Sequence, residues 1–260
     1  MTHADGALEF AIDGPVATLT LNRPAARNAL NSAMWRGIPE LIAKVASDRA
    51  IRVLVIRGAG GHFASGADIT EFGTVFADRE AALAYLSLME AATTALANLE
   101  KPVIARIEGY CIGAGLAIAL ACDLRIAGRD ARLGAPPAKL GLIYSLGDTR
   151  RLVDAVGVST AKAMLFAGGL YPASEALGLR LIDEAHATDD LATVVEGKAL
   201  AMAALSSRSI GRAKALISMI ARGQREETEA TRNWFAEAAT GPDFAEGLAA
   251  FTARRPPVFP

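Results

Sequence analysis

The sequence has few cysteines, few histidines and almost no net charge. Its 260 residues include two cysteines and three histidines, and the formal net charge is −1. Cys111 and Cys122 are too few for a disulfide framework, and neither lies in a cluster with metal-ligand spacing. His3, His62 and His186 lie far apart in the chain, which gives little support to a histidine-based triad or a metal site. We therefore expect no metal, no nucleic-acid partner and a reducing, cytoplasmic location.

Long apolar runs and a secretory signal are also missing. The most apolar stretch, residues 103–122, is interrupted by Arg106, Glu108 and glycines, which is atypical of a membrane-spanning helix. The segment Met1–Gly6 has no basic region followed by an apolar one. With 52% hydrophobic and 21% charged residues, the chain is long enough to bury one large core. We expect a folded protein that does not insert into a membrane.

Two glycine-rich segments each follow a strand-like run. Gly109, Gly113 and Gly115 begin a nearly wholly apolar segment, residues 109–122, which predicts a buried helix. The first N–H groups of a helix have no intrahelical acceptor and point outward with the positive end of the helix dipole. A second small-residue loop, residues 58–69, follows the strand-like run Val53–Arg57. If the fold brought Ala67 and Ala114 together, their N–H groups would form an oxyanion hole.

The order of the expected elements indicates an α/β core. Strands are expected at Val16–Leu21, Val53–Arg57, Val103–Ile107 and Asp123–Ala127, with helices at Ser32–Ala46, Arg79–Leu99 and after Gly115 between them. Asn31 is the expected N-cap of the first helix. After Asp148 we expect helices without further strands, at Thr149–Val156, Thr160–Phe166, Asp189–Leu205, Ser209–Arg222, Glu226–Ala239 and Asp243–Ala253.

Several motifs, in order along nearly the whole chain, resemble the enoyl-CoA hydratase/isomerase (crotonase) family. They are Leu21–Pro24 with Arg27–Asn31, Phe63–Ile69, Gly109–Asp123, Gly168 with Ala173–Leu179, and the tail Asp243–Gly247 with Phe251 and Arg254–Pro256. The resemblance implies a crotonase-like spiral of ββα units over residues 1–200. It also implies that the helical region 201–260 caps the site and builds a homotrimer or a dimer of trimers.

The resemblance also implies a chemistry and a set of site residues. Crotonase-like enzymes bind an acyl-CoA thioester and stabilise its enolate with two backbone N–H groups, which by motif position are those of Ala67 and Ala114. CoA is part of the substrate, so no separate cofactor is expected. Arg27 matches a basic residue near the CoA phosphates, although an exposed surface arginine is the plainer reading. The other expected substrate-binding positions are Ala64, Ser65, Gly66, Asp68, Ile69, Gly113, Pro137 and Leu140.

The chain departs from the family where hydration needs acid and base groups. Family hydratases use two glutamates at positions that match Ala117 and Pro137, and neither of these side chains transfers a proton. The run Leu140-Gly141-x-x-Tyr144-x-Leu146 is similar to the methylmalonyl-CoA decarboxylase branch, in which a tyrosine lies by the substrate carboxylate. That branch has a histidine where Ala67 stands. We therefore expect decarboxylase or isomerase chemistry ahead of hydration.

The sequence leaves several alternatives open. Tyr144 is either a substrate-orienting group or part of the pocket wall. Glu71 is a candidate acid/base or a solvent-facing residue, and Asp148 is a candidate acid/base or a helix cap. The protein could also be a hydratase with a different acid/base, or an acyl-CoA-binding protein without activity. A dinucleotide-dependent dehydrogenase fits less well, because Phe63 and Ile118 stand where its glycine fingerprint requires a small residue.

Overall fold

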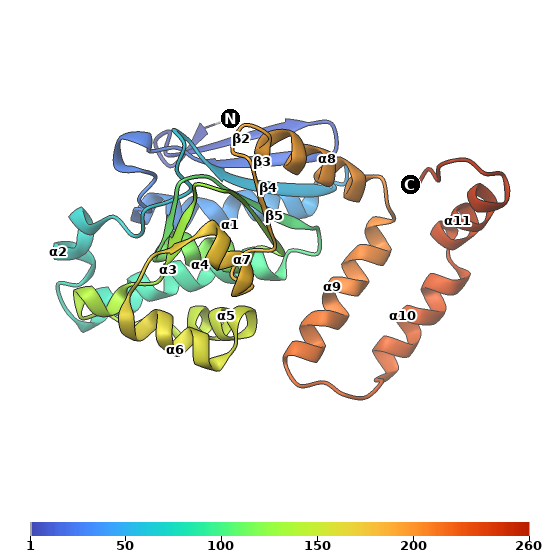
Figure 1. Ribbon diagram of the computed structural model, residues 1–260. Helices are drawn as coiled ribbons and strands as arrows, with labels where there is room; N and C mark the ends of the chain where they lie inside the picture. Colours follow the sequence, from blue (N-terminus) through green and yellow to red (C-terminus); the bar gives the residue numbers. More distant parts are fainter. Residues whose placement is uncertain (1, 260) are drawn as a thin grey trace.

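A seven-stranded sheet forms the centre of the molecule in the computed structural model, which describes residues 2–259 (Figure 1). Its order is β1 (Thr2–His3), β2 (Leu8–Asp13), β3 (Val16–Leu21), β4 (Val53–Gly58), β5 (Val103–Ile107), β7 (Leu124–Gly128) and β10 (Glu184–His186). The first three strands pair antiparallel, and the pairs from β3 to β10 are parallel. Parallel neighbours need crossover connections, which the helices supply. The α/β class expected from the sequence is confirmed.

Helices cover both faces of this sheet. On one face lie α1 (Ser32–Ser47), α3 (Arg79–Asn98) and the buried α4 (Ala114–Ala121), and α8 (Leu191–Ala203) lies on the other (Figure 1). Asn31 is the N-cap of α1, as expected, and its side chain accepts a hydrogen bond from the Met34 N–H at 2.9 Å. Because the central strands are buried on both faces, a run such as residues 53–56 is apolar throughout instead of alternating.

A second, shorter layer of backbone runs beside the large sheet and gives the fold its spiral of ββα units. It contains the sheet of β6 (Tyr110–Ile112), β8 (Arg132–Gly134) and β9 (Tyr171–Pro172). Isolated bridges extend it from Cys111 to Ala64 and from Ala67 to Leu30. Each turn of the spiral therefore contributes a long strand, a short segment in this second layer, and a helix. The second layer is what brings the small-residue loops to one place.

The expectation that no strand follows Asp148 is wrong. Both β9 and β10 lie beyond it, and they are only two and three residues long. Such short strands carry no alternating pattern, and their pairing partners, β8 and β7, come much earlier in the chain. The smaller helices are η1 (Pro24–Ala26), η2 (Ile69–Glu71), α2 (Phe72–Val75), η3 (Pro137–Leu140), α5 (Leu146–Val156), α6 (Val158–Ala167) and α7 (Ala173–Gly178).

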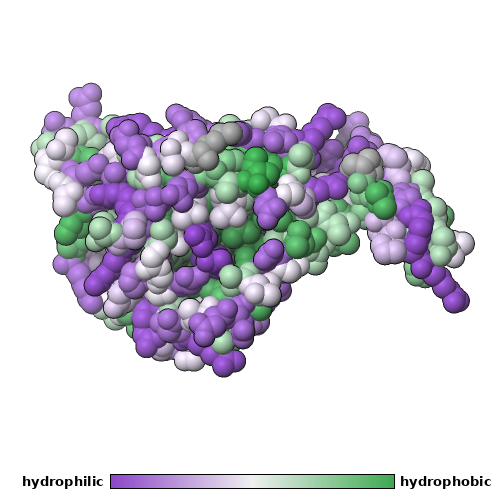
Figure 2. All heavy atoms as spheres, turned by 90° about the horizontal axis from the view of Figure 1, so that it is seen from above, coloured by the Kyte–Doolittle hydropathy of each residue, from purple (hydrophilic) through white to green (hydrophobic). Residues whose placement is uncertain are grey.

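The last helices, α9 (Ser207–Ala221), α10 (Glu229–Thr240) and α11 (Pro242–Thr252), form an arm that projects from the body (Figure 1). Figure 2 shows hydrophobic surface along this arm and where it joins the body. Phe235 and Phe251 on the arm are 78% and 83% exposed. None of the helices within residues 2–259 has the length and apolar character to cross a bilayer.

Candidate active site

The two small-residue loops lie side by side. The Ala64 N–H donates to the Tyr110 carbonyl, and the Ile112 N–H donates to the Ala64 carbonyl, both at 2.9 Å. Further along, a Cβ placed on Gly113 would come within 3.7 Å of the Gly66 Cα. The fold therefore brings together the loops that carry Ala67 and Ala114, although the two residues are 47 positions apart in the sequence.

The backbone N–H groups of Ala67 and Ala114 are available to a ligand. Neither donates a hydrogen bond in the backbone network of the described chain. Ala114 is the first residue of α4, so its N–H points out of the helix at the positive end of the dipole. Gly113, which precedes it, has φ 55°, a left-handed conformation that favours glycine. Both alanines are partly exposed, so these two groups form a candidate oxyanion hole.

Gly115 allows α4 to approach the first loop closely. A Cβ at this position would lie 2.7 Å from both the Cβ and the carbonyl oxygen of Ala64, closer than packed atoms allow. The absence of a side chain here therefore sets the separation of the two loops.

Asp68 orders the first loop. Its carboxylate accepts hydrogen bonds from the Thr70 N–H at 3.0 Å and the Thr70 hydroxyl at 2.7 Å, and it forms a 2.7 Å ion pair with Arg23. Burial alone would raise the pKa of this carboxyl, but the hydrogen bonds from Thr70 and Arg23 outweigh it and hold the pKa below its usual value. The carboxylate is thus a structural brace next to Ala67.

Tyr144 contacts the second loop. Its hydroxyl donates to the Gly113 carbonyl at 2.7 Å, and its ring packs against the main core. Burial, together with the nearby Asp148 and Cys111, raises the pKa of this hydroxyl well above its ordinary value. Tyr144 therefore stays protonated and is a hydrogen-bond donor beside the residue that precedes Ala114.

The two candidate acid/base carboxylates both form hydrogen bonds with groups outside the two loops. Glu71 accepts hydrogen bonds from the N–H and the hydroxyl of Ser32, at 2.8 and 2.7 Å, at the start of α1. Asp148 is buried, accepts from the Ser145 hydroxyl at 2.9 Å, and pairs with Arg151 at 3.1 Å. Burial raises the pKa of Asp148.

Asp148 is not the helix cap that the sequence suggested. Ser145 is the N-cap of α5, and its hydroxyl accepts the Asp148 N–H at 3.1 Å. The helix therefore begins at Leu146, three residues earlier than expected, and Asp148 lies within its first turn. Serine and aspartate are both good N-caps, so the sequence alone did not separate them.

The positions expected to match the family glutamates carry no proton-transfer group. Ala117 is buried in α4, with its N–H bonded to the Gly113 carbonyl at 3.0 Å, and Pro137 begins η3. Of the other expected binding residues, Ile69 and Leu140 expose their side chains, and the Arg27 guanidinium lies 5.4 Å from the centre of the Tyr110 ring. Ser65 donates its hydroxyl to the Ala26 carbonyl.

Two further residues near the loops have contacts that the sequence did not indicate. Asn28 is fully buried, and its amide donates to the Ala59 and His62 carbonyls at 2.8 and 2.7 Å. The His62 ring is stacked on Tyr110 and accepts the Tyr110 N–H at 3.2 Å. Asn28 lies within the motif Arg27–Asn31, which was a usable signal, whereas no pattern in the sequence indicated these contacts of His62.

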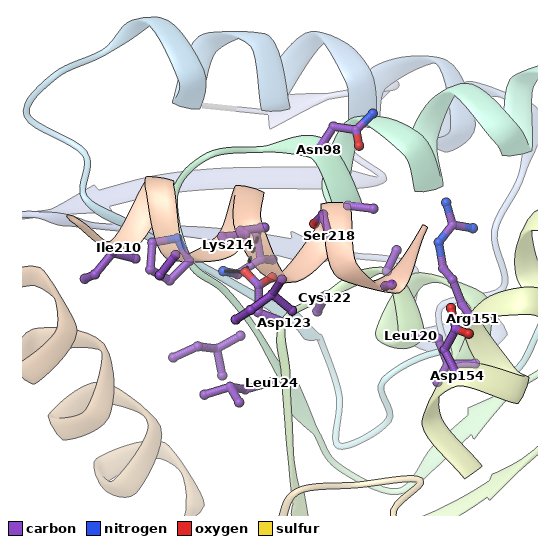
Figure 3. Close-up of a pocket in the computed structure, with 18 of the residues that line it drawn as sticks. Asn98, Leu120, Cys122, Asp123, Leu124, Arg151, Asp154, Ile210, Lys214 and Ser218 are labelled. Carbon is purple, nitrogen blue, oxygen red and sulfur yellow. Dashed lines mark hydrogen bonds and ion pairs between the residues drawn. The ribbon is translucent and has the colours of Figure 1, made fainter. Parts of the chain in front are cut away.

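A cavity of about 640 Å³ lies at the opposite end of α4 (Figure 3). Leu120 and Cys122 line it from one side and Ile210 and Ser218 of α9 from the other, while Lys214 pairs with Asp123 at 2.7 Å. No residue of the two small-residue loops is among its lining residues. Within residues 2–259, no three His, Cys, Asp or Glu side chains are grouped so as to hold a metal ion.

Comparisons with known proteins identify the family and the fold. A profile of the enoyl-CoA hydratase/isomerase family matches residues 11–260. The chain is 34% identical to the 2,3-dehydroadipyl-CoA hydratase of Escherichia coli over 94% of each chain. It superposes with a TM-score of 0.95 on an enoyl-CoA hydratase/isomerase family protein from Hyphomonas neptunium, at 40% identity and covering 98% and 97% of the two chains. An enoyl-CoA hydratase/carnithine racemase structure from Magnetospirillum magneticum gives a TM-score of 0.94 at 35% identity, covering 98% and 95%.

The profile covers nearly the whole chain, and the motifs it spans include both loops that supply the unpaired N–H groups. This chain therefore belongs to the enoyl-CoA hydratase/isomerase (crotonase) family of acyl-CoA enzymes.

Proposed function

We propose that this protein binds an acyl-CoA thioester with its carbonyl oxygen at the Ala67 and Ala114 N–H groups and acts through the enolate. Decarboxylation or double-bond isomerisation is favoured over hydration. The observation that carries the proposal is the pair of free N–H groups on adjoining loops, together with Ala117 and Pro137 at the positions expected to carry carboxylates in family hydratases. One donor in such a hole typically contributes about 3 kcal/mol of barrier reduction.

Decarboxylation fits the side chains better than isomerisation does. In a malonyl-type thioester, the bond between the carboxylate carbon and the α carbon breaks and carbon dioxide leaves. The electron pair moves into the thioester as an enolate, whose oxygen accepts from Ala67 and Ala114, and water then protonates the α carbon. This sequence needs no protein base. Isomerisation needs a base to move a proton between carbons, and Glu71 and Asp148 are both held by other groups.

Tyr144 is the proposed partner of the substrate carboxylate. Its hydroxyl now donates to the Gly113 carbonyl, but that carbonyl also accepts the Ala117 N–H at 3.0 Å. The hydroxyl can therefore turn to a substrate carboxylate without leaving the carbonyl unpaired. A hydrogen bond to a charged acceptor is stronger than one to a neutral carbonyl, which favours the exchange.

Hydration with a different acid/base is the second candidate. It is supported by the name of the Escherichia coli relative, a 2,3-dehydroadipyl-CoA hydratase. Acyl-CoA binding without catalysis is the third. For the assembly we propose a homotrimer or a dimer of trimers built through the helical arm, with Arg27 near the CoA phosphates.

A comparison of three reactions tests the proposal. Malonyl-CoA and methylmalonyl-CoA would be assayed for carbon dioxide release, a 3-enoyl-CoA for isomerisation and crotonyl-CoA for hydration. We expect thioester decarboxylation to exceed hydration. Rapid hydration of crotonyl-CoA with no decarboxylation would favour the second candidate, and saturable binding without any turnover would favour the third.

A further inference from the structure

A short parallel ladder joins the two loops of the candidate oxyanion hole. The Phe63 N–H donates to the Glu108 carbonyl at 2.8 Å, and the Ala64 N–H donates to the Tyr110 carbonyl at 2.9 Å. The Ile112 N–H returns to the Ala64 carbonyl. These bonds fix the position of one loop relative to the other just before each reaches its N–H donor.

One rung of this ladder is made by a side chain. The Tyr110 N–H donates to His62 Nδ1 at 3.2 Å, while the His62 carbonyl accepts from the Asn28 amide at 2.7 Å. The imidazole nitrogen therefore acts as an acceptor in a position where a backbone carbonyl would ordinarily pair.

Packing holds the His62 ring in this position. The ring stacks on that of Tyr110, with centroids 5.1 Å apart and planes at 21°. A Cβ at Gly109 would lie 2.3 Å from His62 Nδ1, so the backbone at 109 passes directly against the ring. The ring therefore packs directly against the second loop.

We propose that His62 is a positioning residue of the oxyanion hole and that it makes the hole dependent on the neutral imidazole. This inference rests on the proposed function. Neutral imidazole can present a lone pair at Nδ1, whereas the protonated ring carries N–H on both nitrogens. Protonation would set an N–H against the Tyr110 N–H and break the rung. The loops would then be free to shift, and a displacement of about 1 Å at a catalytic group can cost about a hundredfold in rate.

Charged side chains also lie along this ladder. Arg27 lies over the Tyr110 ring and Arg106 pairs with Glu108 at 2.8 Å, whereas Arg132 contacts the second loop through its backbone N–H, which donates to the Gly109 carbonyl. Imidazole is the ordinary side chain whose charge changes between about pH 5 and 8. The substitution of His62 therefore tests whether an acid limb in this range comes from this ring.

Two substitutions separate the role of the hydrogen-bond acceptor from that of imidazole protonation. His62→Asn keeps an acceptor near the position of Nδ1 but has no ring nitrogen that takes up a proton. His62→Leu removes the acceptor. His3→Asn in β1 is the matched control for loss of a histidine. We expect kcat of the wild type to fall by tenfold or more on acidification from pH 8 to 5.5, the Asn variant to retain most activity at both, and the Leu variant to be impaired at both.

A binding experiment tests the geometry without turnover. Acetyl-CoA and S-ethyl-CoA differ in the thioester carbonyl oxygen, so the ratio of their Kd values reports on the hole. Two hydrogen bonds of ordinary strength would make this ratio about tenfold or more in the wild type at pH 8. We expect the ratio to fall at pH 5.5 and in His62→Leu, and to persist in His62→Asn. Amide exchange of a peptide covering residues 108–113, compared at one pH, would be faster in the Leu variant.

The outcomes distinguish this inference from the proposed function. The role of His62 would be overturned if His62→Leu kept the wild-type ratio of the two Kd values and unchanged amide exchange at residues 108–113. An acid limb that persists unchanged in His62→Asn would overturn the pH dependence. If the wild type turns over no thioester, the proposed function fails, but binding and exchange still decide on His62. A melting temperature far below that of the wild type would show that His62→Leu has failed to fold. The acid limb measured in His62→Asn then decides on the role of His62.

Discussion

At the residue scale, Tyr144 is the side chain whose substitution tests the decarboxylase hypothesis most directly. Tyr144→Phe deletes one hydroxyl with little change of volume. If the hydroxyl orients a substrate carboxylate, its loss should lower kcat for a malonyl-type thioester. The activation barrier should rise by the free energy of a hydrogen bond to a charged group, about 1.5 to 3 kcal/mol. The thermal stability should change less, because the Gly113 carbonyl keeps the Ala117 N–H.

Tyr171→Phe is a suitable control, since Tyr171 lies in β9 and is also only partly exposed. Unchanged kinetics of the Tyr144 variant, at an unchanged melting temperature, would reduce Tyr144 to part of the pocket wall.

Asp68 gives a pH-dependent prediction. Its pKa in the folded chain is lowered, so its ionised form contributes stability above the unfolded value of about 4, and this contribution is lost as the pH falls through the lowered folded value. Asp68→Asn should therefore lower the free energy of unfolding by about 1 to 2 kcal/mol at pH 7. Urea unfolding at pH 7 and at about pH 3 measures the difference, which should shrink at the acid end. An equal loss at both pH values would contradict it.

At the element scale, the contact between α4 and the first loop depends on Gly115. In Gly115→Ala, the added Cβ meets Ala64 atoms at 2.7 Å, so helix and loop must separate. Overpacking of this kind typically costs about 1 to 3 kcal/mol of stability, and the altered spacing should reduce turnover further.

Gly197→Ala in α8 is the matched control, because a Cβ there would meet no atom within 4 Å. That change should be neutral or stabilising by up to about 1 kcal/mol, since alanine favours helix. If both variants behaved alike in unfolding and kinetic assays, the close contact at residue 115 would not control the site.

Glu71 accepts two hydrogen bonds from Ser32 in the first turn of α1, so we expect that it does not act as a base. Glu71→Gln keeps an acceptor for the Ser32 N–H and hydroxyl, so turnover should remain within about threefold, whereas general base loss commonly costs about a hundredfold or more. Glu71→Ala should instead lower the melting temperature, because the start of α1 loses its brace. Loss of activity in the Gln variant at wild-type stability would restore Glu71 as the acid/base.

Elements with strong local signals were predictable from the sequence, and those defined by distant pairing were not. The apolar strands at 53–57 and 103–107 and the Asn31 cap agree with the structure within a residue. The short strands β9 and β10 exist only because β8 and β7 pair with them. The meeting of the two loops likewise depends on long-range bonds such as that from Ala64 to Tyr110, which periodicity does not encode.

At the scale of the whole molecule, α4 separates two regions of different character. Its first residue supplies an N–H to the candidate oxyanion hole, and its last residues line the cavity beneath α9. Beyond that cavity the arm carries exposed aromatic side chains that the body of the same chain does not cover. Large exposed apolar groups of this kind often mark contacts between chains.

The proposed trimer can be tested on this arm. Phe244 and Phe251 of α11 are 54% and 83% exposed, and burying a phenylalanine side chain is worth about 1.5 to 3 kcal/mol. If these residues lie between protomers, Phe251→Glu should raise the dissociation constant by tenfold or more, because a charge would be placed in an apolar contact. Light scattering during gel filtration should then show a shift from three or six chains toward one.

Asn233→Glu on α10 adds the same charge at an exposed polar position and should leave the assembly intact. A wild-type chain that remains monomeric at micromolar concentration would contradict the proposed trimer, and an unchanged assembly in Phe251→Glu would move its interface away from this face of α11.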